Sequence, residues 1–154
     1  MDYLIVKWLH VLSSTILFGT GIGSAFYMLT ATLQRDARVV AAVARNVVLA
    51  DWLFTTPTVV LQPLTGIYLM YLTGMPMSTR WIAWSLGLYA LAVACWLPVV
   101  WLQIRLKQLA RAAAERNAPL DAQYWRYFRF WFALGVPAFF AFVAVFYLMV
   151  VKPM

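Results

Sequence analysis

Four long apolar segments, separated by short polar ones, dominate the pattern along the chain. They lie at about residues 3–31, 50–73, 81–102 and 128–151. Each has the roughly 20 mostly apolar residues that a helix needs to cross a bilayer. The pattern predicts an all-α membrane protein, a four-transmembrane-helix bundle that forms a single transmembrane domain over residues 1–154.

Two polar stretches between the apolar segments also contain helix-forming residues. We expect residues 36–49 to extend the second helix beyond the membrane, and residues 103–116, rich in Ala, Leu, Gln and Arg, to extend the third. Asn117 and Pro119 should end this extension, and Asp121 should cap the last helix.

The basic residues predict the orientation of the bundle. Lys7, Arg80 and Lys152 lie at one side of the predicted membrane, and the other nine Lys and Arg residues lie in the first and third loops. Because short loops rich in Lys and Arg stay in the cytoplasm, both termini should face the outer, periplasmic side of a bacterial inner membrane. This clustering makes nucleic acid a weaker explanation of the net charge of +7 than contact with the lipid bilayer.

Composition excludes an ordinary water-soluble domain. The chain is 65% hydrophobic and 11% charged, against about 45–50% and about 25% in soluble proteins. Cys95 is its one cysteine, so neither an intramolecular disulfide nor a cysteine metal cluster is possible.

His10, the one histidine, lies about two turns into the first apolar segment. An ionisable residue at such a depth marks a functional site by default. Spacings of three and four residues place small or polar side chains on its face, which should point into the bundle. Among them, Gly21 and Ser24 are expected to leave a recess beneath the imidazole for a porphyrin or another helix. His10 could instead hydrogen-bond to a neighbouring helix, relay protons or bind copper.

The second apolar segment contains two prolines, Pro57 and Pro63. Each frees a backbone carbonyl, so we expect a kinked helix whose polar side chains satisfy the freed groups. Asp51, near its start, is expected to pair with Arg45 or with an arginine of the third loop. The candidates for the freed carbonyls are Thr55, Thr56, Thr58 and Gln62.

Methionines at the outer end of this segment are candidate metal ligands. Met70 should lie at nearly the depth of His10, and His with Met is a known pair of haem iron ligands. Thioether sulfur also suits Cu(I), which Met70, Met75 and Met77 could bind. Gly19 and Gly23, in contrast, are spaced as a helix-packing pair.

Two stretches carry a resemblance to known families. "VKWLHVLSSTILFGTGIGSAFYM" resembles the opening of the HemJ membrane protoporphyrinogen oxidases and of CopD-like copper-resistance proteins. "TTPTVVLQPLTGIYLMYLTG", followed by "RWIAWSLGLYAL", is similar to the next part of HemJ. Over its whole length the chain resembles the predicted integral membrane proteins of domain-of-unknown-function family 2269.

The HemJ resemblance implies that His10 binds haem b. The chain departs from HemJ where that family has a methionine after the TTP turn, here Thr58 and Val59. It departs again where HemJ has a histidine and a lysine in the third helix, here Ala83 and Ser85. Met70, or His10 of a second subunit, would then be the other iron ligand, and oxidation of protoporphyrinogen is not implied.

Three functions follow as expectations. The first is a haem-b-binding membrane protein for electron transfer or a porphyrin redox step, with His10 on iron and Gln62 or Met70 completing the pocket. The second is a small copper or metabolite transport subunit. The third is an assembly partner, as a homodimer or in a larger membrane complex, that docks through Gly19 and Gly23.

Overall fold

The computed structural model describes residues 1–153, and within them the regular structure is entirely helical. Four helices are long and apolar enough to span a membrane, which confirms the predicted fold class. The second of these combines α2, a short π-helical segment and α3 without a break. The elements are α1 (Asp2–Leu33), α2 (Ala37–Ala50), η1 (Asp51–Thr55), α3 (Thr56–Thr73), α4 (Arg80–Glu115) and α5 (Ala122–Val151).

Side-chain caps explain where two helices begin. The carboxylate of Asp36 accepts a hydrogen bond from the backbone N–H of Arg38 at 2.8 Å, at the start of α2. Asp121 accepts one from the N–H of Tyr124 at 2.7 Å, which confirms it as the cap of α5. Such caps satisfy N–H groups that have no partner inside the helix. The last helix therefore begins at Ala122, before the apolar segment that marks its membrane span.

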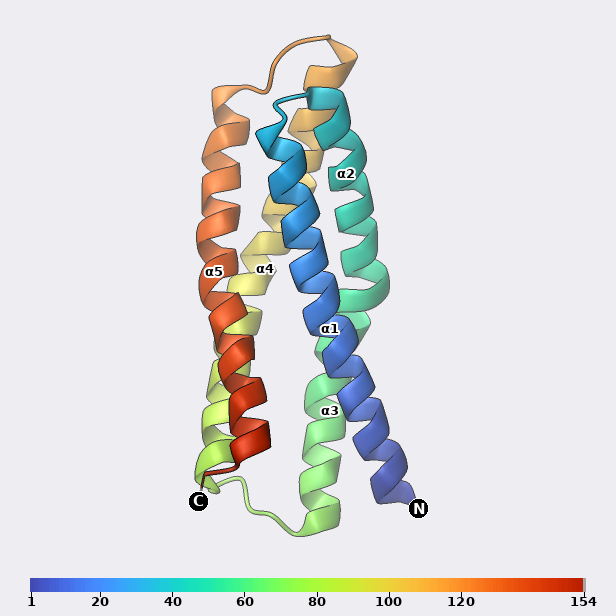
Figure 1. Cartoon of the computed structure of the whole chain (residues 1–154), viewed down its shortest axis with the longest axis vertical. Coiled ribbons are helices and arrows are strands. Elements are labelled where there is room, and N and C mark those ends of the chain that lie inside the picture. The colour runs from blue at the N-terminus through green and yellow to red at the C-terminus, as the bar shows by residue number, and fades with distance from the viewer. Residues whose placement is uncertain (154) are drawn as a thin grey trace.

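The helices form an elongated bundle with all connections at its two ends (Figure 1). Both termini and the α3–α4 turn lie at one end, which we call the terminal end. The α1–α2 and α4–α5 connections lie at the other, which we call the loop end. α4 packs along α5 and α2, and α1 packs along α3, whereas α1 makes few contacts with α5. The bundle is thus two helix pairs that diverge towards the terminal end.

The tightly packed core lies at the loop end. Its buried apolar side chains come from the last turns of α1, from α2, from the second half of α4 and from the start of α5. A hydrogen bond of 2.8 Å between the hydroxyls of Thr32 and Tyr124, both fully buried, joins α1 to α5 there. The loop end therefore holds the helix pairs together.

Pro57 explains the π-helical segment η1. Its ring has no N–H to donate and would clash with the carbonyl four residues earlier in a regular helix. The chain widens just before it, and the N–H of Thr56 bonds to the carbonyl of Asp51. Threonine hydroxyls add local bonds, with Thr56 donating to the Asp51 carbonyl at 2.9 Å and Thr58 to the Phe54 carbonyl at 2.6 Å. Widened turns of this kind are frequent at functional sites.

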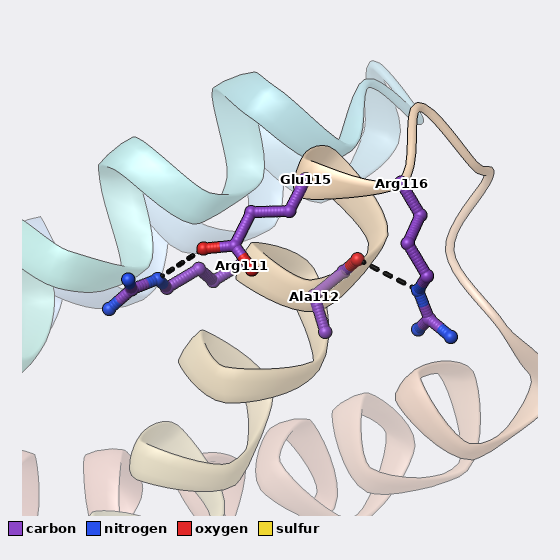
Figure 2. A network of polar contacts seen from close by, with 4 residues as sticks. All are labelled: Arg111, Ala112, Glu115 and Arg116. Carbon is purple, nitrogen blue, oxygen red and sulfur yellow. Dashed lines mark hydrogen bonds and ion pairs between the residues drawn. The ribbon is translucent and has the colours of Figure 1, made fainter.

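Arginine side chains finish α4 at the loop end (Figure 2). The Nε of Arg116 donates to the carbonyl of Ala112 at 3.0 Å, which satisfies one of the last carbonyls of the helix. Arg111 pairs with Glu115 at 2.8 Å, but both side chains are well exposed, so the pair adds little stability. These residues serve the helix end and do not line either cavity of the bundle.

Candidate functional site

Two cavities lie between the diverging helix pairs. One, of about 270 Å³, lies towards the terminal end and is lined by His10; we call it the His10 cavity. The other, of about 380 Å³, lies towards the loop end and is lined by Asp51; we call it the Asp51 cavity. Small-molecule sites in proteins usually enclose about 300–1,000 Å³, so the cavities lie near the lower part of this range. His10 and Asp51 are both ionisable residues that the sequence places in apolar segments.

The imidazole of His10 is fixed against α3. Its Nδ1 lies 2.7 Å from the hydroxyl of Thr65, which itself donates to the carbonyl of Leu61 at 2.7 Å. The ring edge faces Gly66, where an added Cβ would lie only 3.3 Å from the Cε1 of His10. Glycine at this position lets the imidazole lie against the helix backbone.

Gln62 holds the same ring atom from a second side. In the amide orientation that gives each atom a partner, its oxygen accepts from the N–H of Ser14 at 3.0 Å and its nitrogen lies 2.9 Å from the Nδ1 of His10. The ring proton is on Nδ1 when the Thr65 oxygen accepts, and on Nε2 when Gln62 donates. In both tautomers Nδ1 is the occupied nitrogen, and within residues 1–153 no protein group bonds to Nε2.

Met70 lines the His10 cavity together with His10 and Gln62. Met75 and Met149 line it too. Met77 does not, because it follows the left-handed Gly74 in the α3–α4 turn and is 55% exposed. No group of three or more His, Cys, Asp or Glu side chains that could hold a metal occurs in the described part of the chain. A metal in the His10 cavity would depend on His10 and thioether sulfur.

Two lysines lie at the terminal end of the His10 cavity. Lys7 and Lys152 both line it. Their ammonium groups each lie 5.7 Å from an aromatic ring, that of Tyr3 for Lys7 and that of Trp81 for Lys152. The cavity therefore combines apolar walls with positive charge at one end.

Gly21 and Ser24 line the Asp51 cavity, not the His10 cavity. The expected recess beneath the imidazole is therefore not part of the His10 site. The reason is that α1 is inclined to its neighbours (Figure 1), so one stripe of side chains faces different partners along its length. The buried Leu17 lines both cavities and marks the change between them.

Gly19 and Gly23 are not used for packing inside the chain. A Cβ added to either one would meet no atom within 4 Å. Within residues 1–153, no neighbouring helix therefore packs closely against this pair.

Asp51 points into the bundle at the start of η1 and is only 4% exposed. Its Oδ1 accepts a hydrogen bond from the hydroxyl of Thr55 at 2.9 Å, and its Oδ2 has no partner. The predicted pairing with Arg45 or a third-loop arginine is wrong, because the described residues hold no such ion pair. Arg45 is exposed, and six residues along a helix turn a side chain about 240° away.

Residues with unpaired buried polar atoms line the Asp51 cavity. Four buried side-chain atoms in residues 1–153 have no hydrogen-bonding partner, and the residues that carry them all line this cavity. Buried polar atoms are nearly always paired, so such a set calls for an explanation. The sequence carries little signal of this site, because Gln103 begins the polar stretch that follows the third apolar segment. The four atoms are Asp51 Oδ2, Trp96 Nε1, Gln103 Oε1 and Trp131 Nε1.

Four long apolar helices around two small cavities define a polytopic membrane protein. More specifically, the chain belongs to the DUF2269 family of predicted integral membrane proteins, whose family model matches residues 4–153. It matches no curated protein and no solved structure.

Proposed function

We propose that the chain is a haem-b-binding protein of the bacterial inner membrane in which His10 is an iron ligand. One observation carries the proposal: the Thr65 hydroxyl, whose own proton goes to the Leu61 carbonyl, accepts from Nδ1–H of a histidine that lines a mostly apolar cavity, which leaves Nε2 for iron. Histidines that bind metals commonly have their other ring nitrogen held in this way. The resemblance of residues 6–28 to the start of HemJ supports the same role.

The residues of the His10 cavity fit the chemistry of haem b. Nε2 is the imidazole nitrogen left for iron, and Met70 offers the thioether of a His and Met pair. Lys7 and Lys152 would bind the carboxylates of the porphyrin, since ammonium groups pair well with carboxylates. Haem bound here would supply one-electron chemistry.

The chain itself would orient the ring and exclude water. The Thr65 hydroxyl donates its proton to the Leu61 carbonyl, so its oxygen accepts from Nδ1–H of His10. The lone pair of the ring is then on Nε2. Apolar side chains such as Leu86 and Phe146 line the rest of the cavity and favour a hydrophobic ring system. This arrangement suits electron transfer or a porphyrin redox step.

Both termini are proposed to face the periplasm. Nine of the twelve Lys and Arg residues lie towards the loop end, and only Lys7, Arg80 and Lys152 lie towards the terminal end. By the positive-inside rule, the loop end faces the cytoplasm. The His10 cavity then lies in the outer half of the membrane.

An absorption spectrum tests the haem proposal directly. Protein purified in detergent from haem-replete cells should show a Soret band, and His10→Ala should abolish it because the chain has no other histidine. Met70→Leu should shift the reduced spectrum, whereas Met77→Leu is the matched control, since Met77 lies outside the cavity. Colourless wild-type protein would overturn the proposal.

Copper binding is a second candidate, favoured by the three methionines that line the cavity with His10. Met70, Met75 and Met149 present soft sulfur ligands suited to Cu(I). One Cu(I) per chain, lost in Met70→Leu and Met75→Leu but retained in Met77→Leu, would favour a copper transport subunit. Copper bound without dependence on the cavity methionines would exclude it.

Assembly with another helix remains a third prediction. Gly19 and Gly23 are not covered by any helix of the described chain, and small residues four apart allow close helix contact in membranes. A homodimer or larger complex that is lost in Gly19→Leu would support it, and protein that is monomeric in mild detergent and native membranes would contradict it.

A further inference from the structure

The Asp51 cavity has the properties of a second binding site, separate from the His10 cavity. Asp51 is only 4% exposed, and its Oδ2 has no hydrogen-bond partner. Gln103, 5% exposed, lines the same cavity, and its Oε1 also has none. Two acceptors thus lie unpaired in one apolar chamber.

No basic side chain of the described residues lines this cavity. A carboxylate removed from water is costly unless a positive group or hydrogen-bond donors compensate it. In membrane proteins, acidic residues inside the bundle commonly mark the path of a substrate or ion. The missing positive charge would therefore come from a ligand.

Aromatic rings line the cavity around these acceptors. A ring face attracts a cation, and cages of such rings bind alkylated ammonium groups. The indole N–H groups of Trp96 and Trp131 are unpaired donors that would bind an oxygen of the same ligand. The aromatic lining residues are Phe18, Phe26, Trp96, Trp131, Phe132, Phe139, Phe140 and Phe142.

The cavity is accessible from the lipid side of the bundle. Phe26 and Phe140, which line it, are 60% and 63% exposed on the outer surface. A ligand that dissolves in the membrane could enter between α1 and α5, which make few contacts with each other. A strongly hydrated ion would have to shed its water along an apolar wall.

We propose that the Asp51 cavity binds a lipophilic organic ammonium ion. The carboxylate of Asp51 neutralises the cation, the Gln103 oxygen accepts from it or lies against it, and the aromatic rings surround its apolar groups. This site is independent of haem, since none of the four residues with unpaired atoms lines the His10 cavity.

Equilibrium binding of radiolabelled phenyltrimethylammonium to the detergent-purified protein tests the proposal. Binding should saturate at one cation per chain. Asp51→Asn, which removes the charge at constant size, should weaken it at least about 30-fold, because an interfacial charge loses its partner. Asp51→Glu should restore part of the affinity, and the matched control Asp2→Asn, an exposed carboxylate outside the cavity, should bind as the wild type does.

A neutral competitor of the same shape shows whether the cavity recognises the charge of the cation or simply takes up any apolar molecule of that size. tert-Butylbenzene has a carbon where phenyltrimethylammonium has its charged nitrogen, and it should not compete. Effective competition by it, equal binding by Asp51→Asn, or no saturable binding by the wild type would each overturn the proposal. The competition uses only wild-type protein, so it decides the matter even if Asp51→Asn does not fold.

Discussion

The His10 and Asp51 cavities differ in how their ionisable residue is held. In the first, Nδ1 of the imidazole bonds to Thr65 in one tautomer and to Gln62 in the other, and Gly66 lies against the ring. In the second, the Thr55 hydroxyl donates to Oδ1 of the carboxylate, and Oδ2 has no hydrogen-bond partner. An imidazole that coordinates a metal must be held in one orientation. A carboxylate that attracts an organic cation needs only to lack another partner for its charge. The two surroundings match these two requirements.

The largest expected effect is a reciprocal loss of function at the two sites. His10→Ala should remove the haem spectrum and change the affinity for phenyltrimethylammonium less than about twofold. Asp51→Asn should do the reverse, with cation affinity falling at least about 30-fold. Spectra and cation binding measured on the same preparations check this. If either variant removed both signals, the cavities would form a single coupled site.

Removing the hydroxyl that holds the imidazole should have the next largest effect. Thr65→Val keeps the shape of the side chain but loses the 2.7 Å contact with Nδ1, and loss of such a partner weakens metal binding about 10–100-fold. Thr15→Val is the matched control, because Thr15 bonds only to a carbonyl of its own helix and does not line the cavity. Haem titration of the apoprotein measures both. Equal affinities would show that the Thr65 hydroxyl does not orient the ring for iron.

Two glycine substitutions distinguish close contact from open space. In Gly66→Ala the new Cβ would lie 3.3 Å from Cε1 of His10, so the ring must move by a few tenths of an ångström. A displaced rotamer costs about 0.5–1.5 kcal/mol, which corresponds to an about two- to tenfold weaker haem affinity. Gly21→Ala meets nothing within 4 Å and should leave haem affinity unchanged. An effect in the second variant alone would place the porphyrin near Gly21.

The smallest effect concerns the packed loop end, which supports both cavities without lining the His10 site. Tyr124→Phe removes the buried hydrogen bond to Thr32, and such bonds between membrane helices contribute about 0.6 kcal/mol and at most about 1.7 kcal/mol. The free energy of unfolding in detergent should fall by this amount, whereas Tyr147→Phe, at an exposed position, should change it little. The affinities for haem and for phenyltrimethylammonium should stay constant. A large change in one of them would show that the core is coupled to the cavity that binds that ligand.

The sequence predicted the fold because bilayer thickness limits what each apolar segment can do. Four segments of sufficient length define four spanning helices, and the cap at Asp121 follows from local chemistry alone. Met70, which the sequence places at nearly the depth of His10, lines the same cavity as His10. Depth and periodicity were sufficient for these features.

The Asp51 cavity could not be predicted because it depends on the orientation of helices. The inclination of α1 moves Gly21 and Ser24 to another neighbour than His10, and helical spacing alone does not contain that angle. The sequence showed that Pro57 would disturb the helix, but not that the residues before it would form a π-helical segment. The π-helical segment is what turns Asp51 into the bundle.

The π-helical segment also has a consequence for the register of the whole chain. A widened turn of this kind accommodates one residue more than an α-helical turn does, and one residue rotates a helix by about 100°. Deleting a residue from Asp51–Thr55 and restoring α-helix would turn α3 relative to α2 by that angle and carry Thr65 and Gly66 away from His10. The geometry of the His10 cavity is thus encoded, in part, by a single extra residue in η1, beside the Asp51 cavity.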